Sequence, residues 1–464
     1  DALAEATDPS ALATAMAALE AEFTTATGRD SRQKPGETQA GRTVCHLETS
    51  RDIDLTFGAE VLDRLAPLEP LLVSARWLTA ELANAYSAVL AQCYTEVVTE
   101  LGTAEVPFDR LWYPAFDALI GAERPADPVI AEYLRRWREL LGLTAGSTDA
   151  TRINLTTAEL SMAAAAAFPA VAPGWALARI HSPDLHLCAP SLEALRRGDF
   201  TVVLGELHVG LASLDTHFFA VGHPAPDEMV AAMGEDITSS RVALATPYHW
   251  PRTTAREAEW LTGPNDVQLG FAPAPGIDRD RLLPVTALTV ADADAGLLVS
   301  APDGRSWPVI ELFTGLLWMH AFDTWKLAGT DAHTPRVTVD GLVLVRETWR
   351  TTVGESGLAE AKGERDRYLA VRRWRSALNL PERIFLRIDT ENKPCYFDLS
   401  SPLYARILCN MAAAAARKGG PDVGLAASEV LPGPEDAWLP DAQGRCYTSE
   451  LRVHIRDPLP AYPT

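Results

Sequence analysis

The chain has 464 residues, of which 47% are hydrophobic and 22% charged, so a substantial core is expected and a wholly disordered protein is excluded. Its formal net charge of −21 argues against nonspecific binding to nucleic acid, because the field of the whole molecule repels phosphate. No apolar run is long enough to cross a membrane and no signal segment opens the sequence, so we expect a cytoplasmic protein without a membrane partner.

The first part of the chain, residues 1–174, is predicted to be mainly helical. Apolar residues recur at three- and four-residue spacing, and glycines mark stops, in the helices expected over 1–28, 59–101 and 128–142. One strand is expected near 42–57, because apolar and polar residues alternate at its start.

Strands dominate the prediction for the remaining sequence. Residues 175–335 are expected to form a β-rich part with short strands, including a hairpin that turns at the "PDG" of 302–304. Residues 336–464 are expected to form an α+β part, with strands within 336–350, 383–398 and 446–456 and helices near 363–378 and 401–418. Since strands and helices do not alternate regularly, the sequence predicts an irregular α+β fold, with several subdomains of mixed sheets and packed helices.

The common signatures of catalysis and metal binding are missing from the sequence. It contains no zinc-protease, P-loop, serine-hydrolase or Rossmann motif. Its six cysteines are scattered, without the spacing of a zinc site, so reduced and mostly buried thiols are expected. His181, His186, His208 and Glu206 gather in one region, but their spacing does not select three converging ligands. Buried, hydrogen-bonded histidines are therefore expected there, and no metal.

Seven segments carry a shared pattern in order along nearly the whole chain. They are "AGRTVCHLETSRDIDLTFG" (40–58), "LLVSARWLTAELANAY" (71–86), "RIHSPDL" (179–185), "RRGDFTVVLGELHVG" (196–210), "LPVTALTVADADAGLLVSAPDGRSWPV" (283–309), "RIFLRIDTENKPCYFDLSSPLYARIL" (383–408) and "GRCYTSELRV" (444–453). Together they resemble the tRNA-dependent N-terminal domain of class I lanthipeptide dehydratases, also called lantibiotic dehydratases.

The resemblance implies a reaction and its partners. Members of that family transfer glutamate from glutamyl-tRNA to Ser or Thr hydroxyls of a precursor peptide, and a separate domain then eliminates glutamate. The expected partners are therefore an aminoacyl-tRNA and a precursor peptide, with glutamyl-tRNA as co-substrate and no further cofactor. The matched segments correspond to the middle and end of the transfer domain, so a missing N-terminal segment and a separate elimination protein are also expected.

Several alternatives stay open at this stage. A related branch, the peptide aminoacyl-tRNA ligases, adds an amino acid to the C-terminus of a peptide. A module that only binds peptide or tRNA, through strand addition at a sheet edge, is a second alternative, and a homodimer is open as well.

Aminoacyl transfer needs a carboxylate for the substrate ammonium and arginines for the glutamyl carboxylate. The first charged cluster holds Arg42, Glu48 and Arg51, where the family usually carries an Asp that aligns with Glu48. The resemblance implies a catalytic role for Glu48 and substrate binding by Arg42 and Arg51. The alternative is a solvated strand whose Arg–Glu pair contributes little to stability.

A second cluster lies in "SRVALATPYHWPRTTAREAEW" (240–260). By approximate position it resembles the part of the family domain that supplies paired arginines to the aminoacyl pocket. This implies that Arg252 and Arg256 are catalytic and that Arg241 binds substrate. The alternative is a surface loop with solvated arginines.

The third cluster is basic. Residues 362–387 hold eight basic and three acidic residues, a local net charge of +5. Arg365, Arg372 and Arg375 fall near one face of the expected helix, with Arg373 off that face and Trp374 interrupting the run. These four arginines are the predicted tRNA-binding residues, because RNA presents phosphates and unpaired bases. The alternative is a solvated amphipathic helix with Trp374 in the core.

Overall fold

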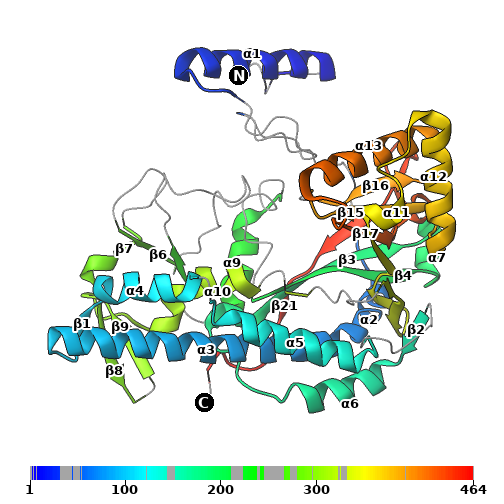
Figure 1. Cartoon of the computed structure of the whole chain (residues 1–464). Coiled ribbons are helices and arrows are strands. Elements are labelled where there is room, and N and C mark those ends of the chain that lie inside the picture. The colour runs from blue at the N-terminus through cyan, green and yellow to red at the C-terminus, as the bar shows by residue number, and fades with distance from the viewer. Residues whose placement is uncertain are drawn as a thin grey trace. The chain divides into compact units, whose positions relative to one another are not determined.

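The computed structural model describes the chain in several ranges (Figure 1). They are residues 3, 5–6, 8–31, 44, 53, 55–121, 123–143, 152–210, 223–237, 241–244, 266–271, 280–294, 296–321, 324–325, 332–391 and 393–462. The chain divides into two compact units. The smaller unit comprises Asp1–Ile53 with Thr348–Val430, and the larger unit comprises Asp54–Glu347 with Leu431–Thr464. The three-part division by element content stays a prediction.

The larger unit contains one long helix, α3, and a series of shorter helices. Their bounds are α2 Ala59–Asp63, η1 Ala66–Leu68, α3 Glu69–Leu101, α4 Phe108–Ile120, α5 Ala126–Leu140, α6 Thr157–Ala167, η2 Ala176–Arg179, α7 Leu192–Arg196, α9 Pro226–Asp236, η5 Val285–Ala287, η6 Val309–Phe313, α10 Thr314–Ala321 and η7 Pro434–Asp436.

Helix α3 follows the sequence rules closely. Pro70 stands in its first turn, and Gly102 ends it in the left-handed conformation, with φ of 70°. Leu78, Leu82 and Tyr86 are fully buried at four-residue spacing, so one stripe of the helix faces the core. Helices α4, α5 and α6 pack against it.

The main sheet of the larger unit is mixed, in the order β2-β12-β13-β4-β3-β20, and β21 pairs with the remaining length of β3. Its strands are β2 Arg152–Leu155, β3 Ile180–Cys188, β4 Thr201–Val209, β12 Arg336–Val339, β13 Leu342–Val345, β20 Ser449–Arg452 and β21 Ile455–Arg456. Strand β3 lies between β4 and the two C-terminal strands, all antiparallel to it. Residues far apart in sequence therefore share its surface.

Smaller sheets complete the larger unit. Strands β1 Val106–Pro107, β8 Thr289–Ala293, β9 Gly296–Ser300 and β10 Ser306–Pro308 form one, and β5 Val242–Leu244, β6 Val267–Gly270 and β7 Leu282–Pro284 form a parallel one. Strands β18 Leu439–Pro440 and β19 Cys446–Tyr447 pair with each other, and β11 spans His333–Thr334. The predicted "PDG" turn joins β9 to β10, with Gly304 at φ of 90°.

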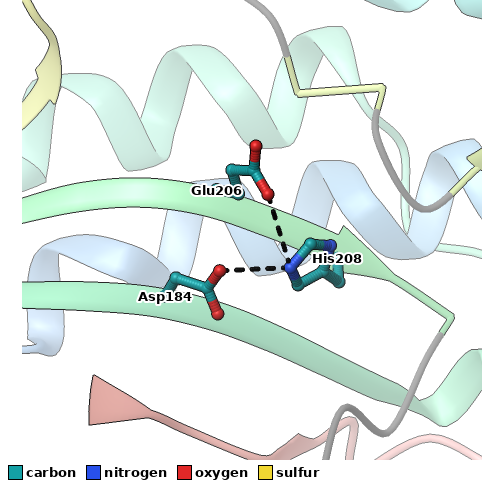
Figure 2. Close-up of side chains that lie close together, drawn as sticks. All are labelled: Asp184, Glu206 and His208. Atoms are coloured by element: carbon teal, nitrogen blue, oxygen red, sulfur yellow. Dashed lines mark hydrogen bonds and ion pairs between the residues drawn. The ribbon is translucent and has the colours of Figure 1, made fainter. Parts of the chain in front are cut away.

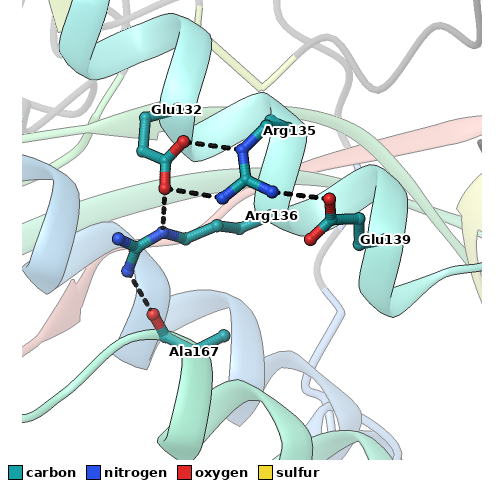
Figure 3. Close-up of polar contacts among 5 residues, drawn as sticks. All are labelled: Glu132, Arg135, Arg136, Glu139 and Ala167. Atoms are coloured by element: carbon teal, nitrogen blue, oxygen red, sulfur yellow. Dashed lines mark hydrogen bonds and ion pairs between the residues drawn. The ribbon is translucent and has the colours of Figure 1, made fainter.

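An arginine on α5 ties this helix to α6 (Figure 3). Arg136 donates to the backbone oxygen of Ala167, the last residue of α6, and lies 4.4 Å over the ring of Trp77. A cation at a helix C-terminus is favourable because the last carbonyls of the helix lack backbone partners. Glu132 pairs with Arg135 and Arg136, which lower the pKa of its carboxyl to about 2.

The smaller unit packs two helices on one face of an antiparallel sheet. Its elements are α1 Pro9–Thr27, β14 Thr348–Thr352, α11 Val353–Ser356, α12 Gly363–Leu378, β15 Arg383–Ile388, β16 Cys395–Asp398, α13 Pro402–Gly419 and β17 Gly424–Glu429. The strands pair in the order β14-β17-β15-β16. Alternate residues such as Ile384 and Leu386 are buried against Val371, Trp374 and Leu408 of α12 and α13.

The predicted α+β class is confirmed, since the described residues form several mixed sheets with packed helices. The helices expected over 1–28 and 128–142 are present as α1 and α5, with α1 beginning at Pro9. The single helix expected over 59–101 is divided into α2, η1 and α3. Most of the strand expected near 42–57 falls outside the described residues. Within the described ranges, none of the helices combines the length and apolarity that a bilayer crossing requires.

Candidate active site

An irregularity in the pairing of β3 with β4 shapes the candidate site. Pro183 pairs with Leu207 and Leu185 with Leu204, so Asp184 lies opposite two residues, Gly205 and Glu206. Such a bulge redirects side chains and is common beside active sites. Glycine fits closely within it, because a Cβ at Gly205 would lie 3.2 Å from the backbone oxygen of Asp184.

The bulge brings three side chains together on one face of the sheet (Figure 2). His208 Nε2 lies 3.1 Å from Oδ2 of Asp184 and 3.7 Å from Oε2 of Glu206. The side chains of Asp184 and His208 are 3% and 9% exposed, whereas that of Glu206 is 56% exposed. The cluster is therefore a buried Asp–His pair with a carboxylate that a ligand can reach from solvent.

Strand β20 adds an arginine to this cluster. Arg452 pairs across the sheet with Asp184, and its Nη1 donates to the same Oδ2 that His208 contacts. Its Nη2 lies 2.6 Å from Oε1 of Glu450. A guanidinium only donates and His208 Nε2 donates to Asp184, so the buried carboxylate accepts from both neighbours. The cluster holds three carboxylates and one guanidinium, an excess of acidic groups that favours a cationic ligand group.

The same atoms could be considered as metal ligands. One oxygen of Asp184, one of Glu206 and a ring nitrogen of His208 all lie within 4.8 Å of one another. However, Arg452 Nη1 contacts the Asp184 oxygen and lies 3.3 Å from His208 Nε2, so a divalent ion there would meet a fixed positive charge at short range. The donor set therefore fits an ammonium group better than a metal ion.

The other two histidines of the region lie apart from this cluster. His181 is 1% exposed, and its Nδ1 accepts from the backbone of Gly210. Burial lowers its pKa to about 4, so it is neutral at neutral pH. The ring of His186 contacts the backbone oxygen of Ser449. His181 fits the expectation of a buried, hydrogen-bonded histidine, whereas His186 is hydrogen-bonded but only half-buried.

Helix α12 presents a basic stripe on its solvent side. Arg365, Arg372 and Arg373 are exposed there, and Arg375 is half-buried. Arg375 Nε donates to the backbone oxygen of Leu380, and its Nη1 lies 3.6 Å from Glu382, so it holds the segment that follows its own helix.

Comparisons with known proteins concern the family of the sequence and the fold of the chain. Residues 315–408, a span that includes α12, match the sequence profile of the family described as lantibiotic dehydratase, N terminus. The predicted resemblance to lantibiotic dehydratases is confirmed. Among curated proteins, none matches the sequence significantly.

A solved glutamylation domain shares the fold. The glutamylation domain TbtB from thiomuracin biosynthesis matches at 17% identity with a TM-score of 0.55. The same domain bound to 5'-phosphodesmethylglutamycin matches at 19% identity with a TM-score of 0.57. Each match covers 97% of this chain and 56% of the solved chain, so the chain spans just over half the length of these relatives. The tRNA dependent lantibiotic dehydratase MibB from Microbispora sp. 107891 matches at 20% identity over 71% of this chain and 32% of its own, but its TM-score of 0.47 does not establish a shared fold.

Five of the site residues expected from the lantibiotic dehydratase resemblance lie outside the described residues. They are Glu48, Arg252 and Arg256, predicted as catalytic, and Arg42 and Arg51, predicted to bind substrate. Their roles stay predictions.

Arg241, the sixth expected site residue, lies within the part of the chain that the structure describes. It precedes β5, and its Nη2 lies 2.8 Å from Oδ2 of Asp266, with side chains only 8% and 14% exposed. The structure thus gives Arg241 a buried carboxylate partner within the protein. Its predicted contact with substrate stays a prediction.

Among the predicted tRNA-binding residues, the exposed Arg365, Arg372 and Arg373 have the placement that phosphate binding requires, and Arg375 has local partners. Trp374 is 4% exposed, so its ring packs in the core and cannot stack on a base. The structure agrees with the alternative for this ring, the core of an amphipathic helix.

Sequence reasoning missed Asp184 and Arg452. Both lie in segments that carry the resemblance, "RIHSPDL" and "GRCYTSELRV", but no pattern pairs residues that are 268 positions apart. The signal that could have found them is a charged residue inside a strand-like segment, Asp184 in the first and Arg452 in the second.

Proposed function

We propose that the chain takes part in aminoacyl-tRNA-dependent transfer of glutamate to Ser or Thr hydroxyls of a ribosomally made precursor peptide. This is the first half-reaction of dehydration in lanthipeptide or thiopeptide biosynthesis. One observation carries the proposal: a fold shared with a glutamylation domain over 97% of this chain holds a solvent-accessible carboxylate beside a buried Asp–His pair and a half-buried arginine.

The chemistry requires positioning more than acid–base power, because the ester of glutamyl-tRNA is already activated. The peptide hydroxyl oxygen attacks the carbonyl carbon of that ester, and the bond from this carbon to the ribose oxygen of the tRNA breaks. The hydroxyl proton ends on the ribose oxygen, so the products are a glutamyl ester of the peptide and free tRNA.

Glu206 is the residue we assign to the α-ammonium of the glutamyl group. Its side chain is exposed, while Asp184 is occupied by Arg452 and His208. An ammonium near Glu206 gains a charge-assisted hydrogen bond and meets the net negative charge of the cluster. Asp184, His208 and Arg452 then act as positioning residues that hold this part of the sheet in place.

The basic stripe of α12 is the surface we assign to tRNA phosphates, through Arg365, Arg372 and Arg373. These side chains are exposed on one unit of an otherwise acidic protein. Replacing Arg372 and Arg373 with alanine should weaken tRNA binding and reduce the slope of log K against log salt by up to about 2. An unchanged slope would limit the stripe to a solvated face. Arg417→Ala, at the exposed end of α13, is the matched control.

The decisive experiment is mass spectrometry of a precursor peptide incubated with this protein, tRNA, glutamate and glutamyl-tRNA synthetase. A mass gain of glutamyl residues, removed by mild base as esters are, supports the proposal. A gain at the peptide C-terminus that resists base would point to amide formation by a peptide aminoacyl-tRNA ligase instead.

A matched pair of variants ties activity to the cluster. Glu206→Gln should lower the transfer rate about ten- to hundredfold, because a charge-assisted hydrogen bond to the ammonium is lost. Glu105→Gln, an exposed acid that precedes β1, should leave the rate unchanged. Equal rates for Glu206→Gln and the unmodified protein would remove Glu206 from the site.

A further inference from the structure

The sheet of the smaller unit has a second face, turned away from α12 and α13. On β15, Ile384, Leu386 and Ile388 are buried against the helices, so the alternate residues Arg383, Phe385 and Arg387 point the other way. By the same alternation, β16 turns Phe397 to the core and presents Tyr396 and Asp398 on the second face.

Two aromatic rings lie side by side on this face. Phe385 and Tyr396 are directly paired across β15 and β16, and their ring centroids are 6.1 Å apart. Both are half-buried, and neither belongs to the hydrophobic core of the unit. Tyr396 also contacts Tyr404 of α13 edge to face, with centroids 5.7 Å apart, which orients the outer ring. The sheet therefore displays an ordered pair of half-buried aromatic rings at the margin of the core.

Arginines flank these rings in register. Arg350 of β14 and Arg387 of β15 both pair with Ala426 of β17, so they stand on either side of a small residue, two positions from Phe385. Arg383 lies at the other end of β15, opposite Asp398, whose carboxylate accepts from the backbone and hydroxyl of Ser400 at 2.9 and 2.6 Å.

The charge of the surrounding segment matches this pattern. Residues 348–430 contain thirteen Lys and Arg against ten Asp and Glu, a net charge of +3 in a chain of −21. A polyanion is therefore repelled less by this segment than by the rest of the chain, and Arg350 and Arg387 place positive charge beside the rings.

We propose that this face binds an unpaired stretch of RNA, whose bases stack on Phe385 and Tyr396 while its phosphates meet Arg350 and Arg387. A sheet that displays aromatic rings between basic residues suits single strands, because bases freed from a duplex can lie flat on the rings. Hydroxyls stand beside the rings at Thr348 and Ser428, which are in register with each other, and Ser428 also pairs with Phe385. They give a ribose 2′-hydroxyl a partner. The inference rests on the proposed function in one respect only, the source of the RNA, which would be the unpaired end of an aminoacyl-tRNA.

The test measures binding of a fluorescent single-stranded RNA of about ten nucleotides by anisotropy, using the full chain at low salt. The same sequence as a duplex and as single-stranded DNA serves for comparison. The single-stranded RNA should bind most tightly. Phe385→Ala and Tyr396→Ala should each weaken it about five- to hundredfold, and Arg387→Ala should weaken it and lower its salt dependence.

Controls separate this face from the rest of the protein. Phe385→Leu keeps an apolar side chain without a stacking surface, so it should weaken RNA binding while leaving the circular dichroism spectrum and melting temperature close to those of the unmodified protein. Arg417→Ala and Tyr113→Ala remove an exposed cation and an exposed ring elsewhere, and should change nothing.

Two results would overturn the inference: duplex RNA bound as tightly as the single strand, or folded Phe385 and Tyr396 variants with unchanged affinity. Because the oligonucleotide carries no glutamate, the assay is independent of glutamyl transfer. Loss of peptide glutamylation with intact oligonucleotide binding would thus count against the proposed function and leave this face as assigned.

Discussion

Replacement of Asp184 by alanine tests whether the buried cluster is a unit. Asp184 is 2% exposed and accepts hydrogen bonds from Arg452 and His208. The bond from Arg452 is charge-assisted and contributes about 1.5–3 kcal/mol, and that from His208 about 0.5–1.5 kcal/mol. Arg452 keeps Glu450 at 2.6 Å in the variant, so it is not left without a partner. We therefore expect the free energy of unfolding to fall by about 3 kcal/mol, near the lower end for a broken buried ion pair.

Urea unfolding at neutral pH, followed by tryptophan fluorescence, measures this change. Trp438 is a suitable reporter, because its indole nitrogen donates to the backbone of Leu187 on β3. Arg452→Met and the double variant complete a thermodynamic cycle, in which a coupling energy of about 2 kcal/mol is expected because the two residues touch. A loss below about 1 kcal/mol for Asp184→Ala, or simple additivity of the two changes, would refute the reasoning.

Three further predictions concern stability. The folded protein holds His181 neutral, whereas the unfolded chain protonates it below its ordinary pKa. About 3 kcal/mol of stability should therefore be present above pH 6.5 and be lost as the pH falls toward 4. His181→Gln should flatten this part of the pH profile of stability. Trp112→Ala should cost about 3–5 kcal/mol in urea unfolding, because the ring is 2% exposed and stacks 4.9 Å from Phe313, whereas Tyr113→Ala, at a side chain 62% exposed, should stay within about 0.5 kcal/mol. Gly174→Ala should cost more than about 2 kcal/mol and lower the melting temperature, since its φ is +104° and a Cβ would lie 2.4 Å from the Cβ of Ala83; a smaller loss would mean that α3 can move aside.

Local sequence signals predicted the helices and turns whose structure depends on interactions between residues close in sequence. The apolar periodicity of 59–101 corresponds to α2, η1 and α3, and the "PDG" turn gives the β9–β10 hairpin. Helix α4 shows where such signals fail. Pro114 lies inside it, against the usual rule, and the helix is held by the burial of Trp112 and Leu119 in the core.

The candidate site lies beyond such signals because its geometry depends on pairing between distant strands. Glu206 and His208 were visible as charged and titratable residues of one segment, but their convergence with Asp184 depends on the bulge between β3 and β4. Arg452 joins only through the register of β20 with β3. Long-range register is set by the whole core, so composition and periodicity of a single segment cannot predict it.

The position of β20 also has a consequence for synthesis. Asp184 and Arg452 are 268 residues apart, and a ribosome adds about 5–20 residues per second, so the arginine follows the aspartate by tens of seconds. During that interval the nascent chain holds a carboxylate destined for the interior without its strongest counter-charge. Slow translation or early release would leave this edge of β3 open to water, and to any foreign strand that reaches it first.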